Sequence, residues 1–211
     1  MGLLSILVGA TTFVTGLLAA PIDFRLPPPP KSALLFAADG KTQFATIRAP
    51  EQREPVKAAD IPEVMRQAII SAEDERFLDH KGVDPIATVR AAYRDLSGGR
   101  LQGGSTLTQQ YVKYVYLEDS SRTAERKLRE AALALRLERK KSKEEILTDY
   151  LNVLYLGNGT YGVQAASKYY YGVGIKDLDL DVKRKRRDPI LALARASMLA
   201  GVAPAPSAWN P

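Results

Sequence analysis

The chain opens with an uninterrupted apolar stretch. No charged side chain occurs between positions 2 and 22, where Leu, Ile, Val, Phe, Ala and Gly dominate. Because about 20 helical residues span the hydrocarbon core of a bilayer, the pattern predicts a transmembrane anchor over residues 1–22. A cleaved signal peptide ending near Ala19-Ala20 is the alternative, although its apolar region would be only about 7–15 residues long.

A proline-rich linker over residues 23–33 follows this stretch. Its four consecutive prolines at positions 27–30 form a stiff spacer. The remaining residues, 34–211, are predicted to form one domain. Near its start, apolar residues flank the turn dipeptide Asp39-Gly40, which predicts a small hairpin of two strands.

Apolar residues then recur at spacings of three and four, the period of a helix. Four segments begin with helix-capping residues. These predicted helix starts are Asp60 with Glu63, Asp84-Pro85, Ser142 with Glu145, and Asp188-Pro189. Glycines end the last three, at Gly98-Gly99, near Gly157 and at Gly201. Since helices and strands do not alternate and no repeat is evident, the predicted fold class is mainly α.

Composition narrows the chemistry that the chain can carry. Its 211 residues are 45% hydrophobic and 26% charged, as in a folded domain. Thirty basic against 24 acidic residues give a net charge of +6, which favours an anionic partner. The chain has no cysteine, which excludes disulfides, thiolate catalysis and cysteine-ligated metals. The single histidine, His80, excludes a site with several histidine ligands.

A basic block at residues 183–187 raises the question of nucleic-acid binding. A solvated loop before the last helix is the other interpretation. No aromatic residues interleave the cations, and a membrane-anchored chain rarely meets DNA, so we expect no nucleic-acid partner.

Three segments hold candidate reactive residues, and the first surrounds Glu73. Ile69, Ile70 and Phe77 stand four before, three before and four after it, on the same helical face. Partial desolvation by these neighbours would raise the pKa of the Glu73 carboxyl and make it a better proton acceptor. An ordinary helix-end carboxylate in water is the alternative.

The second segment, residues 103–113, combines glycines, hydroxyls and amides ahead of Lys113. Such a combination resembles a phosphate cradle. The Gly-Lys-Ser/Thr ending of a Walker loop is absent. A glycine-rich surface loop is the alternative.

The third segment, residues 122–138, contains Glu130 four residues after Arg126 and three after Lys127. On a helix both cations would flank the carboxylate and favour its ionised form. A surface set of ion pairs is the other explanation. One carboxylate in apolar surroundings and one among cations suit acid–base chemistry at a sugar. The predicted core stripe of this helix is Leu128, Ala131, Ala132 and Leu135.

Together these segments resemble the peptidoglycan glycosyltransferase family, the transglycosylase module of class A penicillin-binding proteins and of monofunctional transglycosylases. The resemblance extends from about Leu34 to Pro211. It rests on Glu-Asp-x-x-Phe-x-x-His-x-Gly-x-Asp at 73–84, Gly-Gly-Ser-Thr-x-Thr-Gln-Gln-x-x-Lys at 103–113 and Arg-Lys-x-x-Glu at 126–130. The resemblance implies a lysozyme-like helical fold that polymerises lipid II into glycan strands, with inversion and release of undecaprenyl pyrophosphate.

The resemblance also implies roles for individual residues. Glu73 would be the general base that deprotonates the acceptor 4-hydroxyl, and Glu130 would assist the departing pyrophosphate. Fixed cations would stabilise the charge that develops on this leaving group. The implied cations are Lys113, Arg122 and Arg126, and the implied sugar- or phosphate-binding residues are Ser105, Gln109 and Gln110. His80, Gly82 and Asp84 are expected to be architectural.

Further implied features are a cofactor and partners. Asp74 would contact a divalent cation, Mg²⁺ or Mn²⁺, because a hard cation with oxygen ligands suits pyrophosphate. The implied partners are lipid II, the growing glycan strand, the bacterial membrane and a transpeptidase domain or partner. The domain would lie on the extracytoplasmic side of the cell membrane.

Two positions depart from the family pattern. Tyr114 stands where the family usually has Asn, and Arg195 stands where it usually has Glu. Two other functions stay open. One is a lysozyme-like hydrolase that cleaves glycan by acid catalysis, and the other is a non-catalytic membrane module that binds lipid II.

Overall fold

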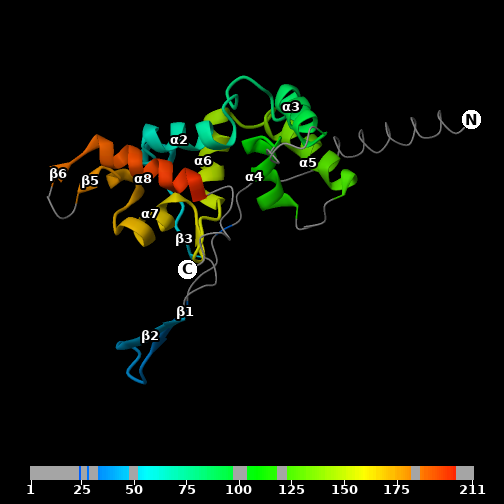
Figure 1. Ribbon diagram of the computed structural model, residues 1–211. Helices are drawn as coiled ribbons and strands as arrows, with labels where there is room; N and C mark the ends of the chain where they lie inside the picture. The colour runs from blue at the N-terminus through cyan, green and yellow to red at the C-terminus, as the bar shows by residue number, and fades with distance from the viewer. Residues whose placement is uncertain are drawn as a thin grey trace, which may run out of the picture. The chain divides into compact units, whose positions relative to one another are not determined.

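A computed structural model describes residues 24, 28, 33–47, 52–96, 104–117, 123–181 and 186–202 (Figure 1). The chain divides into two compact units. Unit 1 comprises Met1–Leu26 and Asp74–Leu147, and unit 2 comprises Pro27–Glu73 and Thr148–Pro211. The predicted anchor at residues 1–22 lies outside the described residues. Among the helices that are described, none has the length and apolar character needed to cross a membrane.

The described residues are mainly helical, which confirms the predicted fold class. The helices are α2 (Glu63–Glu73), α3 (Pro85–Leu96), α4 (Leu107–Tyr116), α5 (Ala124–Leu137), α6 (Lys143–Val153), α7 (Val163–Tyr171) and α8 (Pro189–Val202). Two 3₁₀ turns are η1 (Ala58–Asp60) and η2 (Ile175–Asp177). The short strands are β1 (Ala33–Phe36), β2 (Gln43–Ile47), β3 (Gln52–Arg53), β4 (Thr160–Tyr161), β5 (Leu180–Asp181) and β6 (Arg186–Arg187).

The predicted hairpin is formed by β1 and β2. The two strands pair antiparallel, with Leu35 opposite Ala45. Asp39 closes the turn, because its Oδ1 accepts hydrogen bonds from the backbone N–H groups of Lys41 and Thr42, each at 2.9 Å. The predicted turn dipeptide therefore lies at the hairpin's bend.

Three of the four predicted helix starts are confirmed by their caps. Asp84 Oδ1 accepts from the N–H of Ile86 at 2.9 Å at the start of α3. Asp188 Oδ1 accepts from the N–H of Ile190 at 3.0 Å at the start of α8. Ser142 and Glu145 exchange hydrogen bonds before α6, as a capping box requires.

The predicted helix start at Asp60 is wrong. Asp60 ends the turn η1, and α2 begins at Glu63. Ile61 lies between them with an extended backbone (φ −93°, ψ 113°). Proline disfavours the helical conformation at the residue before it, so Pro62 separates the turn from the helix.

The helix that follows Ser142 also ends earlier than predicted. It stops at Val153 rather than near Gly157. Gly157 and Asn158 have positive φ angles of 84° and 48°, which a right-handed helix cannot contain. The chain turns back there, and the N–H of Leu156 donates to the carbonyl of Thr160 at 2.9 Å.

The core of unit 2 lies between α2 and α8, which pack against each other (Figure 1). Met65 and Ile69 of α2 are fully buried, and α8 buries Ala196 and Leu199. Asn152 at the end of α6 contributes a second link within this unit. Its side chain accepts from the N–H and donates to the carbonyl of Val56, each at 2.9 Å.

The predicted core stripe of α5 is partly wrong. Leu128 and Leu135 are 55% and 38% exposed, whereas Ala132 is buried. The buried face instead runs through Glu130, Leu133, Ala134, Arg136 and Leu137. The inward face of α5 therefore includes a carboxylate, which can be buried because two cations on the same helix contact it.

Candidate active site

A buried carboxylate with two cationic partners lies on α5 in unit 1. Glu130 is only 2% exposed. Its Oε2 accepts a hydrogen bond from Arg126 Nη1 at 3.1 Å, and its Oε1 accepts one from Lys127 Nζ. The predicted pairing of Glu130 with both cations is confirmed, because helical spacings of four and three bring the three side chains together.

Lys127 extends this arrangement to a residue outside the helix. Its Nζ also donates to Ser105 Oγ at 2.6 Å. We call Ser105, Arg126, Lys127 and Glu130 the Glu130 cluster. The sequence motifs singled out Ser105, Arg126 and Glu130 as site residues but not Lys127. The helical spacing of Lys127 to Glu130 could have indicated that Lys127 belongs to the site. Its contact with Ser105 arises only from tertiary packing.

The Glu130 cluster can bind an anion. The Arg126 and Glu130 side chains are mostly buried, whereas the Lys127 side chain is 44% exposed. The ammonium group has three N–H donors, and the contacts with Ser105 and Glu130 use two of them. Lys127 can therefore reach a phosphate oxygen from solvent while it stays bound to the cluster.

Residues 107–113 lie in α4, and residues 104–106 lead into it without forming an exposed loop. Thr106 caps α4 in a capping box with Gln109. The Thr106 Oγ1 accepts from the N–H of Gln109 at 3.2 Å, and Gln109 Oε1 accepts from the N–H of Thr106 at 3.0 Å. Gln109 is buried, and its side-chain oxygen accepts a hydrogen bond within this cap. Ser105 precedes the cap directly, which fixes its backbone beside a rigid helix end.

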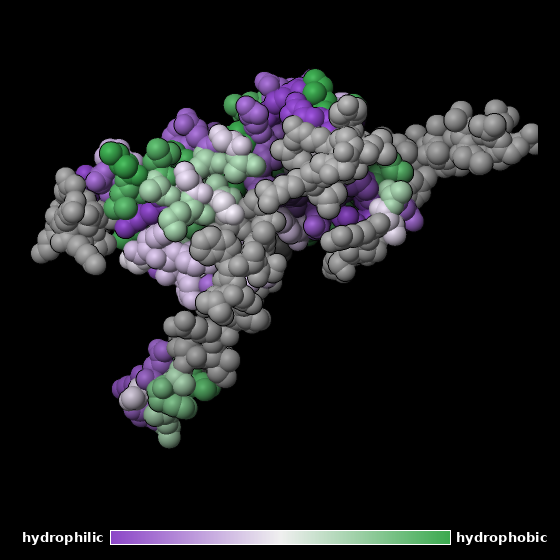
Figure 2. All heavy atoms as spheres, in the orientation of Figure 1, coloured by the Kyte–Doolittle hydropathy of each residue, from purple (hydrophilic) through white to green (hydrophobic). Residues whose placement is uncertain are grey.

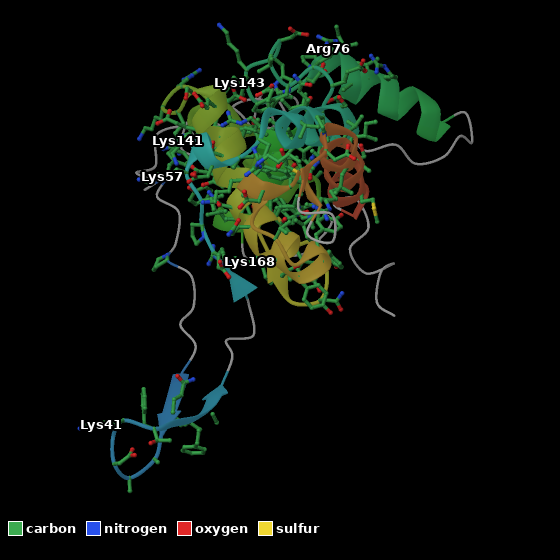
Figure 3. All side chains as sticks on the ribbon, turned by 90° about the vertical axis from the view of Figure 1, so that its left-hand side faces the viewer. Lys41, Lys57, Arg76, Lys141, Lys143 and Lys168 are labelled. Carbon is green, nitrogen blue, oxygen red and sulfur yellow. The ribbon has the colours of Figure 1, made fainter. Side chains whose placement is uncertain are left out.

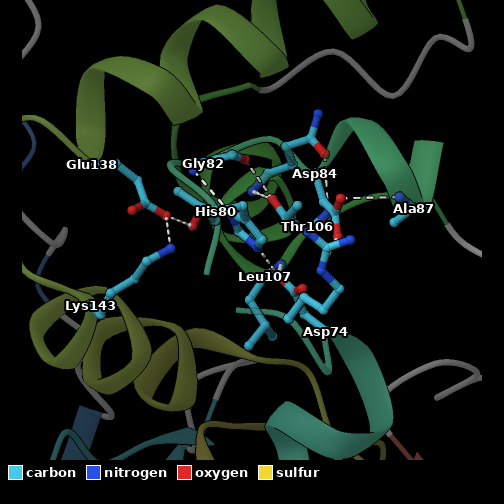
Figure 4. A network of polar contacts seen from close by, with 12 residues as sticks. Asp74, His80, Gly82, Asp84, Ala87, Thr106, Leu107, Glu138 and Lys143 are labelled. Carbon is cyan, nitrogen blue, oxygen red and sulfur yellow. Dashed lines mark hydrogen bonds and ion pairs between the residues drawn. The ribbon is translucent and has the colours of Figure 1, made fainter. Parts of the chain in front are cut away.

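A buried network ties the residues after Glu73 to this helix start (Figure 4). His80 Nδ1 accepts from the N–H of Gly82 at 3.1 Å, and Nε2 lies 2.9 Å from Asp74 Oδ2. Since Nδ1 is the acceptor, Nε2 carries the proton and donates to Asp74. Asp74 Oδ2 also accepts from the N–H of Leu107 at 2.9 Å, the first residue of α4.

Gly82 brings the same loop against α5. Its φ of +97° is unfavourable for a residue with a Cβ, and an added Cβ would lie 2.7 Å from the Ala134 carbonyl oxygen. Its own carbonyl accepts from Thr106 Oγ1 at 2.6 Å. The loop, α4 and α5 of unit 1 are therefore held together, and His80 and Gly82 are architectural, as expected.

Asp84 completes this loop. It is buried, caps α3 and lies 3.7 Å from the Arg76 guanidinium. Burial by itself would raise the pKa of Asp84, but the Ala87 N–H, the Arg76 charge and the Ile86 N–H lower it more. The pKa of Asp84 therefore lies below its ordinary value of 3.8. The N–H groups at the start of α3 and the Arg76 charge therefore stabilise the ionised form of Asp84.

Glu73 is the last residue of α2 and ends the first of the two segments that make up unit 2. The side chain is half-buried, and its Oε1 atom is buried. On α2, Ile69 is fully buried and Ile70 is half-buried. Desolvation of the Glu73 carboxyl by its apolar neighbours remains a prediction. The general-base role of Glu73 remains a prediction.

The other predicted site residues lie on or near α4. Lys113 is exposed, and its Nζ lies 5.7 Å from the ring centre of Tyr114. Gln110 is half-buried. The described contacts do not join Lys113 to the Glu130 cluster. Arg122 lies outside the described residues. The structure thus brings together Ser105, Arg126 and Glu130 from the predicted set.

The surroundings of Asp74 do not fit a bound divalent cation. Asp74 is buried, and its Oδ2 accepts two hydrogen bonds from His80 and Leu107. A cation would have to compete with both donors for this oxygen. Across the described ranges, no group of three or more His, Cys, Asp or Glu side chains is placed to hold a metal ion. The contacts of Asp74 favour a structural role.

Comparisons with known proteins agree with the resemblance of the motifs. The family model described as Transglycosylase matches residues 40–211. Penicillin-binding protein 1F of Bacillus subtilis strain 168 is 43% identical over 162 residues, which cover 76% of this chain and 21% of that protein. Penicillin-binding protein 1A of Streptococcus pneumoniae is 43% identical over 175 residues, 82% of this chain and 22% of that protein.

A third relative is penicillin-binding protein 1A of Pseudomonas aeruginosa, 42% identical over 180 residues, 84% of this chain and 20% of that protein. The chain thus spans about a fifth of the length of these curated relatives. The family model covers most of the chain, from the hairpin turn to the last residue. The chain therefore belongs to the transglycosylase family, whose members are peptidoglycan glycosyltransferases.

Proposed function

We propose that this chain is a peptidoglycan glycosyltransferase that polymerises lipid II into glycan strands and releases undecaprenyl pyrophosphate. Family membership supports the class of reaction. The observation that carries the proposal is the Glu130 cluster, in which a buried carboxylate holds two cations next to a serine hydroxyl. Such a group of fixed charges suits a pyrophosphate leaving group.

In the proposed reaction, Glu73 removes the proton from the acceptor 4-hydroxyl. The hydroxyl oxygen attacks the anomeric carbon of the donor sugar, and the bond from that carbon to the pyrophosphate oxygen breaks. Attack from the opposite side inverts the anomeric configuration. The proton ends on Glu73 and the electron pair of the broken bond ends on the pyrophosphate.

Lys127 and Arg126 have the charge needed at the leaving group. Fixed cations stabilise the developing negative charge without reorganising during the reaction. Glu130 holds Lys127 and Arg126 in place through its two oxygens. Its role is therefore to orient the cations, and Ser105 adds a further contact to Lys127.

The same cluster argues against hydrolysis of finished glycan. A hydrolase acting by acid catalysis has no diphosphate to neutralise. The cations of the Glu130 cluster therefore favour transfer from a lipid diphosphate. A non-catalytic module that binds lipid II is the remaining alternative. A turnover assay distinguishes such a module from an enzyme.

The setting of the reaction follows from its substrate. Lipid II is membrane-bound, so we propose that the domain works on the extracytoplasmic side of the bacterial cell membrane, with residues 1–22 as a single anchor. The relatives are named penicillin-binding proteins. A transpeptidase domain or partner is accordingly proposed to receive the glycan strand.

Turnover of purified lipid II tests this proposal. Glu73→Gln removes the proton acceptor while it preserves the size of the side chain, and we expect polymerisation to fall by about 10²-fold or more. Glu63→Gln is the matched control, because Glu63 is an exposed carboxylate on the same helix. The control should polymerise lipid II at the wild-type rate.

Further arms of this assay address the alternatives. Consumption of polymeric peptidoglycan instead of lipid II would indicate a hydrolase. Lipid II binding without turnover in the wild-type chain would indicate a binding module. Addition or chelation of Mg²⁺ tests, independently of Asp74, whether the reaction uses the divalent cation that the resemblance implies.

A further inference from the structure

A second carboxylate at the end of α5 is buried in unit 1. Hydrophilic side chains of this unit gather at its surface around α3, where water solvates them (Figure 2). Glu138 directly follows the last residue of α5, and only 6% of its side chain is exposed. Burying a carboxylate is costly unless donors bond to it. The partners of Glu138 therefore indicate what it does there.

The first partner of Glu138 is a hydroxyl on another helix. Glu138 Oε1 accepts a hydrogen bond from Thr108 Oγ1 at 2.6 Å. Thr108 is fully buried in the first turn of α4. Hydrogen bonds to an ionised group are shorter and stronger than those between neutral groups. Thr108 therefore ties the start of α4 directly to the end of α5.

The second partner, Lys143, holds the Glu138 carboxylate in place from the start of α6. Lys143 Nζ donates to the same Oε1 at 2.8 Å (Figure 4). The ammonium also lies 4.4 Å from the centre of the Phe77 ring, within the range of a cation–π contact. Phe77 is fully buried. Because Lys143 is held on two sides, it restrains the carboxylate that bonds to Thr108.

The segment that precedes and begins α4 is thus fastened to α5 at two points. The first point is the hydrogen bond between Ser105 and Lys127. The second is the hydrogen bond between Thr108 and Glu138, about three helical turns farther along α5. Thr106 caps α4 between them, which makes the segment rigid. One contact would let the segment pivot, whereas two contacts fix where the Ser105 hydroxyl meets the Lys127 ammonium.

We propose that Thr108 and Glu138 are positioning residues that set how the Lys127 ammonium is presented to a phosphate oxygen. They act through Ser105 and do not have to contact the substrate. Ser105 and Glu130 take two of the three N–H groups of Lys127, so the place of Ser105 directs the third. The effect on turnover rests on the proposed function, in which Lys127 stabilises the leaving group.

Thr108→Val in the full chain tests this proposal. The substitution removes the hydroxyl and keeps the branched shape of the side chain. Because small misplacements of reacting groups slow an enzyme strongly, we expect kcat for purified lipid II to fall about tenfold. KM should change by less than about twofold, since the contact with Lys127 strengthens only as the pyrophosphate departs. Thr108→Ser keeps the hydroxyl and should restore most of the wild-type kcat.

A double variant shows whether Thr108 acts through Lys127. In a Lys127→Met chain, the ammonium that Thr108 positions is already gone. Adding Thr108→Val to that chain should therefore lower kcat by less than about twofold. A purely structural role of Thr108 would instead lower kcat by the same factor in both backgrounds.

Acetylation by acetic anhydride, followed by mass spectrometry, reports on Lys127 without any turnover. The Lys127 side chain is 44% exposed, so the reagent can reach it. Its nitrogen has to leave Ser105 and Glu130 before it reacts. If Thr108→Val loosens the contact with Ser105, the acetylation rate of Lys127 should rise about threefold or more.

Thr88→Val is the matched control. Thr88 Oγ1 donates to the carbonyl of Asp84 at the start of α3, also in unit 1. This variant loses a hydroxyl hydrogen bond that does not involve α4 or α5. Its kcat and its Lys127 acetylation should stay at the wild-type values. Equal losses of kcat in Thr88→Val and Thr108→Val would indicate general destabilisation and contradict the proposal.

Lys143→Met provides a second test that leaves the buried Thr108 in place. It removes one of the two partners of Glu138 Oε1, and kcat should fall about threefold. Lys141→Met is its control, because it removes the same charge two residues earlier (Figure 3). The charge of Lys141 acts on the exposed Glu145. The control should polymerise lipid II at the wild-type rate.

The outcomes separate this proposal from the proposed function. Wild-type kcat in Thr108→Val or in Lys143→Met would overturn the positioning role. Unchanged acetylation of Lys127 in Thr108→Val would show that Thr108 does not hold the ammonium in place. A wild-type chain that never consumes lipid II, while acetylation still rises in Thr108→Val, would refute the proposed function and leave the positioning of Lys127 intact.

Discussion

The Lys127 ammonium group lies 2.6 Å from the hydroxyl oxygen of Ser105, a residue 22 positions earlier in the chain. The same ammonium contacts Glu130 within α5. Lys127 is thus the residue that joins two sequence motifs, Gly-Gly-Ser-Thr and Arg-Lys-x-x-Glu, in unit 1.

Lys127→Met keeps the length of the side chain and removes its charge. If Lys127 stabilises a departing pyrophosphate, turnover of lipid II should fall about 10²-fold or more, as for loss of one donor at a developing charge. Arg129→Met is the control, because Arg129 is half-exposed on the same helix and pairs with Glu125 at the surface. Equal rates in both variants would remove Lys127 from the mechanism.

His80→Ala tests the buried network after Glu73. It leaves the Gly82 N–H without its acceptor and removes one of the two donors to Asp74 Oδ2. We expect the free energy of unfolding, measured in urea, to fall by about 2–3 kcal/mol. His80→Gln offers both a donor and an acceptor and should recover part of this loss. A His80→Ala chain as stable as wild type would contradict the network.

Gly82→Ala and Gly172→Ala separate a clash from backbone strain. Both glycines have positive φ, +97° and +70°. A Cβ at Gly82 would lie 2.7 Å from the Ala134 carbonyl, whereas nothing lies within 4 Å of one at Gly172. Strain alone costs about 1–2 kcal/mol, so Gly82→Ala should be the more destabilising by about 1–3 kcal/mol. Urea unfolding measures both, and equal losses would contradict the close packing of the loop on α5.

Asp84 makes stability depend on pH in the acid range. Its pKa in the folded chain is lowered below 3.8, although burial opposes the shift, because backbone N–H groups and Arg76 favour the carboxylate. The unfolded chain keeps the ordinary pKa, so it binds the proton before the folded chain does as the pH falls. The stabilisation by the Asp84 carboxylate is therefore complete at neutral pH and is lost at acidic pH. Urea unfolding between about pH 5 and pH 2 should therefore show a steeper loss in wild type than in Asp84→Asn.

The control for this pH series is Asp79→Asn, since Asp79 is exposed in the same loop. Its profile should follow that of wild type. If Asp84→Asn lost stability with the wild-type slope, the cap would not be the source of the acid sensitivity.

Much of the helical structure could be predicted because its signals are local. Asp84, Ser142 and Asp188 start helices as predicted, since a cap bonds to backbone two or three residues away. Asp60 was misread because the effect of Pro62 on Ile61 overrides the capping pattern. The buried face of α5 was misread because apolar spacing alone places Leu128 inside, whereas Glu130 occupies the inward side.

The sequence by itself determined the family, the helix starts and the pairing of Glu130 with Arg126 and Lys127, because each motif, cap and ion pair that indicates them is formed by residues close together in the chain. Only the tertiary structure decided that Lys127 reaches Ser105 and that Gly82 lies against Ala134. These contacts join segments far apart in the chain. They depend on how α4, α5 and the loop pack together, and no local spacing records that packing.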